Sequence, residues 1–152
     1  MKKEIKIGVI GLGYVGLPVS VLFSTKYEVI GFDINSKRVE LLNQYNDTTL
    51  EISEQELKKG IDKNLKVTNQ LNDLKDCNFY IITVPTPINN KNIPDLEPLK
   101  NATSSVSKIL SKGDIVVYES TVYPGCTEEV CIPILEEKTD LKYNKDFFCG
   151  YS

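Results

Sequence analysis

The chain contains no histidine, although it is 152 residues long. This absence excludes a histidine general base and a Ser-His-Asp triad within these residues, and it removes one of the usual ligand types of zinc. The four cysteines, Cys77, Cys126, Cys131 and Cys149, show no Cys-x-x-Cys spacing, so we expect no metal site. Such cysteines are typical of reduced, buried or half-buried thiols in a cytoplasmic protein.

A strong net charge and long apolar runs are also lacking. The 18 Lys and Arg against 21 Asp and Glu leave a net charge of −3, so we expect neither nucleic acid nor an anionic membrane as a partner. The first residues resemble the start of a signal peptide, but Glu4 and Lys6 interrupt it, and the apolar stretch that follows is short and rich in glycine. We therefore expect a first β-strand there and no targeting or membrane-spanning segment. The length and the hydrophobic content of 41% suit one globular domain.

The most informative stretch that is present ends at Asp33. An apolar strand leads into Gly11-Leu-Gly13-Tyr-Val-Gly16, an apolar helix is expected over about 14–25, and a second strand ends on Asp33, 22 residues after Gly11. The G-x-G-x-x-G spacing alone is a weak signal. Between a strand and a helix, with an acid at that distance, it is the pattern of a dinucleotide-binding βαβ unit.

Each residue of this pattern has a physical role. Gly11 permits a backbone turn that a Cβ would obstruct, Gly13 leaves room for a pyrophosphate, and Gly16 lets the helix pack closely on the strand. The N-terminus of the helix then points its free N–H groups at the phosphates. The Asp33 carboxylate can accept hydrogen bonds from both hydroxyls of an adenosine ribose. Because it would repel a 2′-phosphate, it favours NAD over NADP. The alternative is a glycine turn that binds nothing.

The rest of the chain continues the alternation of strands and helices. Expected helices cover 36–42, 53–59, 95–110 and 127–138, and expected strands cover 65–68, 79–84, 115–118 and 147–150. Asn35 or Ser36 is the expected cap of the first of these helices. This order predicts an α/β fold of the Rossmann type, in which helices cover both faces of a doubly wound parallel sheet.

Several helix ends have local signals. Ser53-Glu-Gln-Glu56 is a capping box, and Asp95 and Thr127 are the expected caps of the two later helices. Pro133 lies inside the last helix, which we expect it to kink.

Polar side chains follow three of the expected strands. Ligands of such sheets bind at the carboxyl ends of the strands, near the point where the strand order reverses. Besides the glycine turn, the candidates are therefore Asp33, Val84-Pro-Thr86 and Glu119-Ser-Thr121. We expect Glu119 to be a strand-end carboxylate with a structural partner rather than a catalytic base.

Four motifs together resemble the NAD-binding half of UDP-sugar 6-dehydrogenases, in the UDP-glucose/GDP-mannose dehydrogenase family. They are Gly11-Leu-Gly-Tyr-Val-Gly-Leu-Pro18, Phe32-Asp33 with Arg38-Val39, Thr83-Val-Pro-Thr-Pro87 and Glu119-Ser-Thr-Val-Tyr-Pro-Gly125. The most similar branch acts on UDP-N-acetylgalactosamine or UDP-N-acetylglucosamine in polysaccharide biosynthesis. The resemblance extends over essentially all 152 residues, and its last two motifs are more specific than the glycine fingerprint.

The resemblance implies a reaction. Enzymes of this family oxidise the C6 alcohol of a nucleotide sugar to a carboxylate with two NAD⁺ and water. The first hydride transfer gives an aldehyde, which a cysteine captures as a thiohemiacetal. A second hydride transfer gives a thioester that is then hydrolysed. The protein positions the nicotinamide against C6, while the cofactor carries the hydride.

The resemblance also implies roles for individual residues. The cofactor-binding residues would be Gly11, Gly13, Tyr14, Val15, Gly16, Asp33, Arg38, Thr86 and Thr121. Backbone N–H groups of Tyr14 and Val15 would bind the pyrophosphate, and Arg38 would lie over the adenine and reach the ribose. Thr86 would line the side of the nicotinamide, and Thr121, the one catalytic candidate, would place its hydroxyl near the nicotinamide and the catalytic water. The ordinary alternatives are a solvated helix arginine, a proline-stiffened loop and a turn residue.

The chain departs from the family at its end. The family's catalytic glutamate, lysine, asparagine, and nucleophilic cysteine with its aspartate would all lie beyond Ser152, and none of the four cysteines present is in a comparable setting. We therefore expect an N-terminal fragment that binds NAD but is inactive alone. The missing half would bind the UDP-sugar, and the full-length enzyme would be a homo-oligomer. Two alternatives remain open: another NAD-dependent dehydrogenase, of the 3-hydroxyacid or 6-phosphogluconate type, and a non-enzymatic NAD(H)-sensing module.

Overall fold

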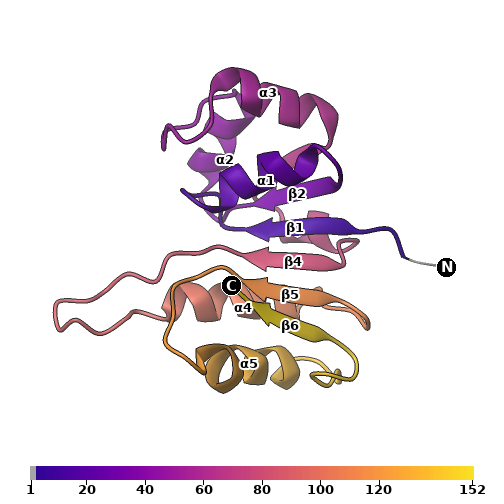
Figure 1. The fold of residues 1–152 in the computed structure, drawn as a ribbon, viewed down its shortest axis with the longest axis vertical. Helices are drawn as coiled ribbons and strands as arrows, with labels where there is room; N and C mark the ends of the chain where they lie inside the picture. Colours follow the sequence, from indigo (N-terminus) through magenta and orange to yellow (C-terminus); the bar gives the residue numbers. More distant parts are fainter. Residues whose placement is uncertain (1–2) are drawn as a thin grey trace.

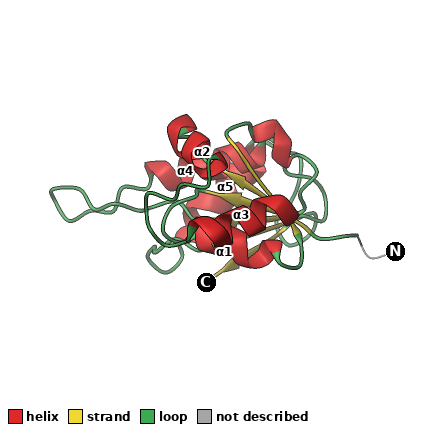
Figure 2. Cartoon of the chain, turned by 90° about the horizontal axis from the view of Figure 1, so that it is seen from above, coloured by secondary structure: helices red, strands yellow, loops and turns green. Residues whose placement is uncertain are grey.

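The computed structural model describes residues 3–152, which form one parallel sheet with helices on both faces (Figures 1 and 2). The six strands lie in the order β3-β2-β1-β4-β5-β6. Their bounds are Lys6–Ile10 (β1), Glu28–Phe32 (β2), Leu65–Thr68 (β3), Phe79–Ile82 (β4), Ile115–Tyr118 (β5) and Phe148–Tyr151 (β6). The strand order reverses between β1 and β4, because the chain passes from the outer strand β3 back to the other side of β1. The prediction of a doubly wound Rossmann-type sheet is confirmed.

Side chains alternate between the two faces of the sheet because successive residues of a strand point to opposite sides. The helices are Gly16–Ser24 (α1), Ser36–Asn43 (α2), Glu54–Lys63 (α3), Glu97–Ser107 (α4) and Ile132–Glu137 (α5), with single turns at Leu71–Leu74 (η1) and Thr127–Cys131 (η2). One core contains Val9 and Ile81 together with residues of α1, α2 and α3. The other contains Ile10 and Ile82 together with residues of α4 and α5. Each face of the sheet is therefore covered by its own helices.

Two of the expected helix starts are confirmed. Asn35 caps α2, because its side-chain oxygen accepts the N–H of Arg38 at 3.1 Å. Ser53 and Glu56 form the complete capping box at the start of α3. Both signals depend only on residues three positions apart, so tertiary packing does not alter them.

The expected caps of α4 and of the last helix are wrong. The Asp95 carboxylate accepts the N–H of Glu97 at 2.9 Å, but this closes a turn before the helix, and Leu96 occupies the cap position without a side-chain bond. Thr127 is buried inside a π-helical turn rather than capping an α-helix. The wide turn ends with the N–H of Ile132 bonded to the carbonyl of Thr127, directly before Pro133. The expected helix over 127–138 is therefore present as one helical run, but its first turn is π-helical and its α-helical part, α5, ends at Glu137.

The connection between β4 and α4 projects from the body of the protein on the side where the strands end, opposite the N-terminus (Figures 1 and 2). Its tip is closed by main-chain bonds and by the side chain of Asn89, which accepts the N–H groups of Lys91 and Ile93. In residues 3–152, no helix combines the length and the apolar character that a bilayer crossing would need.

Candidate functional site

A cleft of about 670 Å³ opens at the carboxyl ends of β1, β2, β4 and β5, on both sides of the point where the strand order reverses. Its walls come from 10–15, 32–34, 83–86 and 119–121, and from α4 through Pro98, Asn101, Ala102 and Ser105. This volume lies within the range of about 300–1,000 Å³ that is typical of small-molecule sites. The cleft therefore lies where ligands bind in doubly wound sheets.

The glycine turn forms one wall, and its three glycines meet different demands. Gly11 has a φ of +97°, in the left-handed region that favours glycine. A Cβ on Gly16 would lie 1.7 Å from the carbonyl oxygen of Gly11 and 2.4 Å from Oγ1 of Thr83. A Cβ on Gly13 would meet no protein atom within 4 Å. The fold thus requires glycine at 11 and 16, whereas the space above Gly13 is open to a ligand.

Asp33 defines one end of the cleft, called here the Asp33 end. Its Oδ2 accepts the N–H of Leu12 and its Oδ1 accepts the N–H of Asn35, both at 2.9 Å. These bonds fix the carboxylate against the glycine turn. A carboxylate has about four lone-pair positions, so acceptor capacity remains for the two hydroxyls of a ribose.

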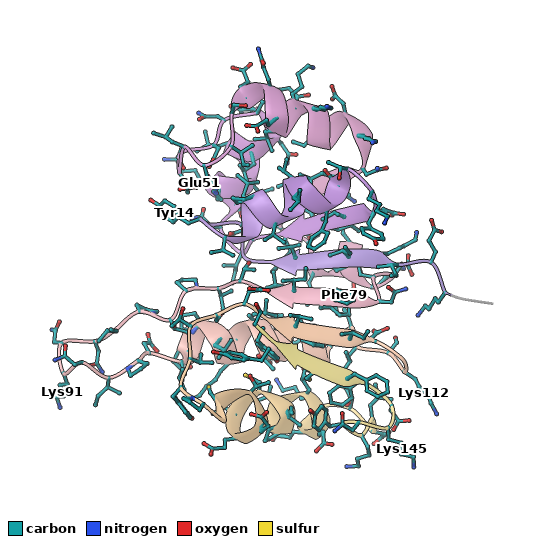
Figure 3. All side chains as sticks on the ribbon, in the orientation of Figure 1. Tyr14, Glu51, Phe79, Lys91, Lys112 and Lys145 are labelled. Atoms are coloured by element: carbon teal, nitrogen blue, oxygen red, sulfur yellow. The ribbon has the colours of Figure 1, made fainter. Side chains whose placement is uncertain are left out.

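The start of α1 faces the same cleft. Tyr14 and Val15, which directly precede α1, line it and are 69% and 47% exposed. The first N–H groups of a helix have no acceptor within the helix and attract anions. Figure 3 shows Tyr14 at the side of the sheet where the strands end.

Thr86 and Thr121 lie together at the other end of the cleft, called here the threonine end. The Thr86 hydroxyl donates to the carbonyl oxygen of Thr121 at 2.7 Å, and the Ser120 hydroxyl donates to the carbonyl oxygen of Val84 at 2.8 Å. These two bonds join the segments that follow β4 and β5. The structure thus brings together two predicted site residues that are 35 positions apart in the sequence.

Arg38 and Gly16 are the predicted site residues that do not line the cleft. The Arg38 side chain is only 10% exposed and forms an ion pair of 2.9 Å with Asp47. Its Nε donates to the carbonyl oxygen of Leu12 at 2.9 Å, and its Nη1 donates to Thr48 at 3.2 Å. The guanidinium is therefore held beside the glycine turn, and the expected stacking on an adenine stays a prediction.

Asp47, whose side chain is 1% exposed, was not among the predicted site residues. Its two carboxylate oxygens accept the N–H groups of Thr49, Glu51 and Ile52 and the hydroxyl of Thr49, at 2.7–3.0 Å. Burial raises the pKa of Asp47, but these bonds and Arg38 outweigh it and lower the pKa to about 2. An Asp followed by two threonines in a loop is a signal of side-chain bonds to nearby backbone N–H groups.

Thr83 opens one of the four motifs, but its contacts were not predicted. Its hydroxyl lies 2.7 Å from the carbonyl oxygen of Gly11 and 3.1 Å from that of Ile10. The bonds join the end of β4 to the glycine turn, over 72 residues of sequence. No pattern within either segment alone predicts them.

The four thiols are free, and none lines the cleft. Burial raises the pKa of Cys77 and Cys149 to about 12 and that of Cys131 to about 11. A thiol is a poor nucleophile when it stays protonated, so these cysteines do not offer a covalent site. In the described part of the chain, no three Cys, Asp or Glu side chains are grouped so that they could hold a metal ion.

Comparisons with known proteins agree with this geometry. The sequence profile of the UDP-glucose/GDP-mannose dehydrogenase family, NAD binding domain, matches residues 5–151. UDP-N-acetyl-D-glucosamine 6-dehydrogenases of Salmonella typhi and Pseudomonas aeruginosa are each 54% identical, over 98% and 99% of this chain. A solved structure of UDP-D-ManNAc dehydrogenase from Pyrococcus horikoshii superposes with a TM-score of 0.91 at 36% identity, over 97% of this chain.

The chain is much shorter than these relatives. It corresponds to 35% of the length of each of the two glucosamine dehydrogenases and to 35% of the solved chain. The matched region includes the whole cleft and none of the remaining two thirds of those proteins.

Proposed function

Because the chain belongs to the UDP-glucose/GDP-mannose dehydrogenase family, as an NAD-binding domain, we propose that it serves an enzyme that oxidises the C6 alcohol of a UDP-N-acetylhexosamine to the uronic acid with two NAD⁺. The main support for this proposal is the cleft, where the fixed carboxylate of Asp33 and the unobstructed space above Gly13 lie at the ends of adjacent strands. The remaining, C-terminal part of that enzyme would bind the UDP-sugar and supply the nucleophilic cysteine. The enzyme would work in the cytoplasm as a homo-oligomer, in polysaccharide biosynthesis.

NAD would lie along the cleft, with its adenosine toward Asp33 and its nicotinamide toward the threonine end. Asp33 would accept the hydroxyls of the adenosine ribose, and the N–H groups at Tyr14 and Val15 would bind the pyrophosphate above Gly13. Thr86 would face the nicotinamide side, and the Thr121 hydroxyl would lie near the nicotinamide and the attacking water. NAD⁺, when bound, accepts the hydride, and the chain's own part is to hold and orient it.

The substrate to test first is UDP-N-acetylglucosamine, because both of the relatives that are 54% identical carry that name. UDP-N-acetylgalactosamine, which the resemblance also named, is the second candidate. The match over residues 5–151 argues against a 3-hydroxyacid or 6-phosphogluconate dehydrogenase. A non-enzymatic NAD(H) sensor has no specific observation in its favour.

Calorimetric titration with NAD⁺ and NADP⁺ tests the cofactor half of the proposal. We expect NAD⁺ to bind more tightly than NADP⁺, and Asp33→Ala to weaken NAD⁺ by about tenfold or more, since a charged hydrogen-bond partner is worth about 1.5–3 kcal/mol. Asp62→Ala is the control, because Asp62 lies in an exposed ion pair with Lys58 on α3. A folded protein that binds neither dinucleotide would overturn the proposal.

The substrate half needs the full-length enzyme. NADH formation with UDP-N-acetylglucosamine, UDP-N-acetylgalactosamine and a 3-hydroxyacid would be compared. Two NADH formed per sugar are expected for an alcohol oxidised to a carboxylate, and one for an oxidation that stops at the carbonyl. Activity with the hydroxyacid alone would contradict the proposed substrate class.

A further inference from the structure

One face of α4 forms a wall of the cleft. The residues of this helix that line the cleft are Pro98, Asn101, Ala102 and Ser105. Their spacing of three and four positions places them on one side of the helix, which is called here the cleft face of α4. It presents two polar and two apolar side chains, so it can meet both the flat surface and the polar edge of a ligand.

The cleft face of α4 is directed toward the Asp33 end. On roughly the opposite side of the helix, Thr103 bonds to Tyr118 of β5 at 3.1 Å, and α4 packs against α5, which lies near β6 (Figure 1). The strands β5 and β6 form one half of the sheet, and β2 lies in the other half. The cleft face is therefore directed toward β2, where Phe32 and Ala102 line the cleft as members of the same core.

A ribose held by Asp33 leaves one direction for the base that it carries. The base is attached to the carbon next to the one that bears the 2′-hydroxyl, so it must lie beside Asp33. The N–H of Leu12 bonds to this carboxylate from the side of the glycine turn, and the pyrophosphate would lie above Gly13. The base would therefore extend away from the glycine turn, between Ile34 and α4. Ile34 lines the cleft and is 86% exposed, so a flat ring there would cover apolar surface that is open to water.

Asn101 offers the polar groups that the edge of a base requires. Its side chain is exposed, and within residues 3–152 its amide forms no hydrogen bond. The Ser105 hydroxyl, one turn further along, donates to the backbone carbonyl of Asn101 at 3.0 Å, so its own proton is already used. An amide has a donor and an acceptor side by side. This pair matches the N6 amine and the N7 atom of adenine, which asparagine binds with two hydrogen bonds where proteins recognise DNA bases.

We propose that the cleft face of α4 is the adenine subsite and that Asn101 is its specificity-determining residue, with its amide bound to the N6 amine and N7 of the base. This inference rests on the proposed function, since it requires NAD in this cleft. It assigns to α4 a selection that Asp33 does not make. Asp33 would distinguish a 2′-hydroxyl from a 2′-phosphate, whereas Asn101 would distinguish adenine from another base.

The test compares the Kd values of NAD⁺ and of nicotinamide hypoxanthine dinucleotide, in which a carbonyl oxygen replaces the N6 amine. We expect wild-type protein to bind NAD⁺ about tenfold more tightly, because N7 and O6 of hypoxanthine are both acceptors and one amide cannot donate to both. Asn101→Ala should bind the two dinucleotides equally, through a loss of NAD⁺ affinity. This variant should fold, since Asn101 is exposed on a helix and alanine favours helices.

Asn72→Ala is the matched control, because Asn72 is exposed on η1, outside the cleft. It should keep the wild-type ratio of the two Kd values. The inference is overturned if wild-type protein binds both dinucleotides equally, or if Asn101→Ala keeps the wild-type ratio. If the wild-type protein binds no NAD⁺, the proposed function itself has failed, which is a different result from either of these.

Discussion

The two ends of the cleft are built from different kinds of contact. At the Asp33 end, a carboxylate and a guanidinium hold the N–H and the carbonyl of the same residue, Leu12, and a second buried carboxylate holds the guanidinium. At the threonine end, two hydroxyl-to-carbonyl bonds join two connecting segments. Hydrogen bonds that involve charged groups are roughly twice as strong as neutral ones.

This difference suggests that the Asp33 end serves mainly to bind the cofactor and the threonine end mainly to position it for the reaction. The Asp33 end is fixed in advance, so little ordering is lost when it takes up a ligand. The threonine end is held by weaker bonds between connecting segments, which are the parts of a fold most able to move. We infer that the Asp33 end supplies most of the affinity for the dinucleotide, and that the threonine end adjusts around the reacting ring.

The largest expected effect is on stability, and it comes from Gly16, which we compare with Gly13 in the same turn at the Asp33 end. Gly16→Ala would place a Cβ 1.7 Å from the carbonyl oxygen of Gly11, and main-chain atoms cannot move away as a side chain can. We expect the free energy of unfolding to fall by about 3 kcal/mol or more, measured by urea denaturation.

Gly13→Ala is the matched variant. A Cβ there meets no protein atom within 4 Å, so the free energy of unfolding should change by no more than about 0.5 kcal/mol. NAD⁺ affinity should fall nonetheless, because the added methyl group occupies the space of the pyrophosphate. A Gly13→Ala protein that binds NAD⁺ normally would show that no ligand group occupies the open space above Gly13. An unstable Gly13→Ala protein would show that the fold itself requires glycine there.

The second prediction concerns acid stability at the Asp33 end. The pKa of Asp47 is lowered from 3.8 to about 2. A carboxylate with a lowered pKa stabilises the folded protein while it is ionised. This stability is fully present above the pKa of the unfolded state and is lost as the pH falls through the pKa of the folded state. The contribution is about 2 kcal/mol, so the wild-type protein should lose this amount relative to Asp47→Asn as the pH falls from about 4 to about 2.

Urea denaturation at a series of pH values measures this difference. Asp62→Asn again serves as the control, since its ion pair with Lys58 has both side chains more than half exposed, and exposed pairs contribute about 1 kcal/mol at most. Equal acid sensitivity of wild type and Asp47→Asn would mean that Asp47 does not hold the loop as its bonds indicate.

The same contrast explains how much the sequence could predict. The glycine turn and the acid at the end of the following strand form a compact local pattern that predicted one wall of the cleft. The alternation of strands and helices predicted the sheet, but nothing predicted that α4 would line the cleft. The caps at Asn35 and Ser53 were predictable because each bond spans three residues. In these places local preference and tertiary structure agree.

Other features depend on segments that meet only in the folded protein. The ion pair between Arg38 and the buried Asp47 was not predicted, because the two residues lie in separate segments of the chain. The bond from Thr83 to Gly11 spans 72 residues. The π-turn before Pro133 contacts α4, a helix that lies 20 or more residues earlier in the chain. Such contacts are fixed by packing, which a motif does not encode.

The smallest expected effect lies at the threonine end. Thr86→Val keeps the shape of the side chain but removes the hydroxyl that donates to the carbonyl oxygen of Thr121. One neutral hydrogen bond is worth about 1 kcal/mol, so the free energy of unfolding should fall by no more than this amount. Because the change loosens the segments after β4 and β5, and leaves Asp33 intact, NAD⁺ affinity should fall by less than in Asp33→Ala.

Thr25→Val provides the comparison, since the Thr25 hydroxyl also donates to a carbonyl oxygen at 2.7 Å but lies just after the end of α1, outside the cleft. It should leave NAD⁺ affinity unchanged. In the full-length enzyme, we expect Thr86→Val to lower the rate of NADH formation at saturating NAD⁺ by a larger factor than it raises the apparent Kd of NAD⁺. The reason is that the variant orients the nicotinamide less well, while the other end of the cofactor stays bound. If Thr86→Val loses as much NAD⁺ affinity as Asp33→Ala, both ends of the cleft bind the cofactor equally. The contrast between charged and neutral contacts would then not assign binding to one end and the reaction to the other.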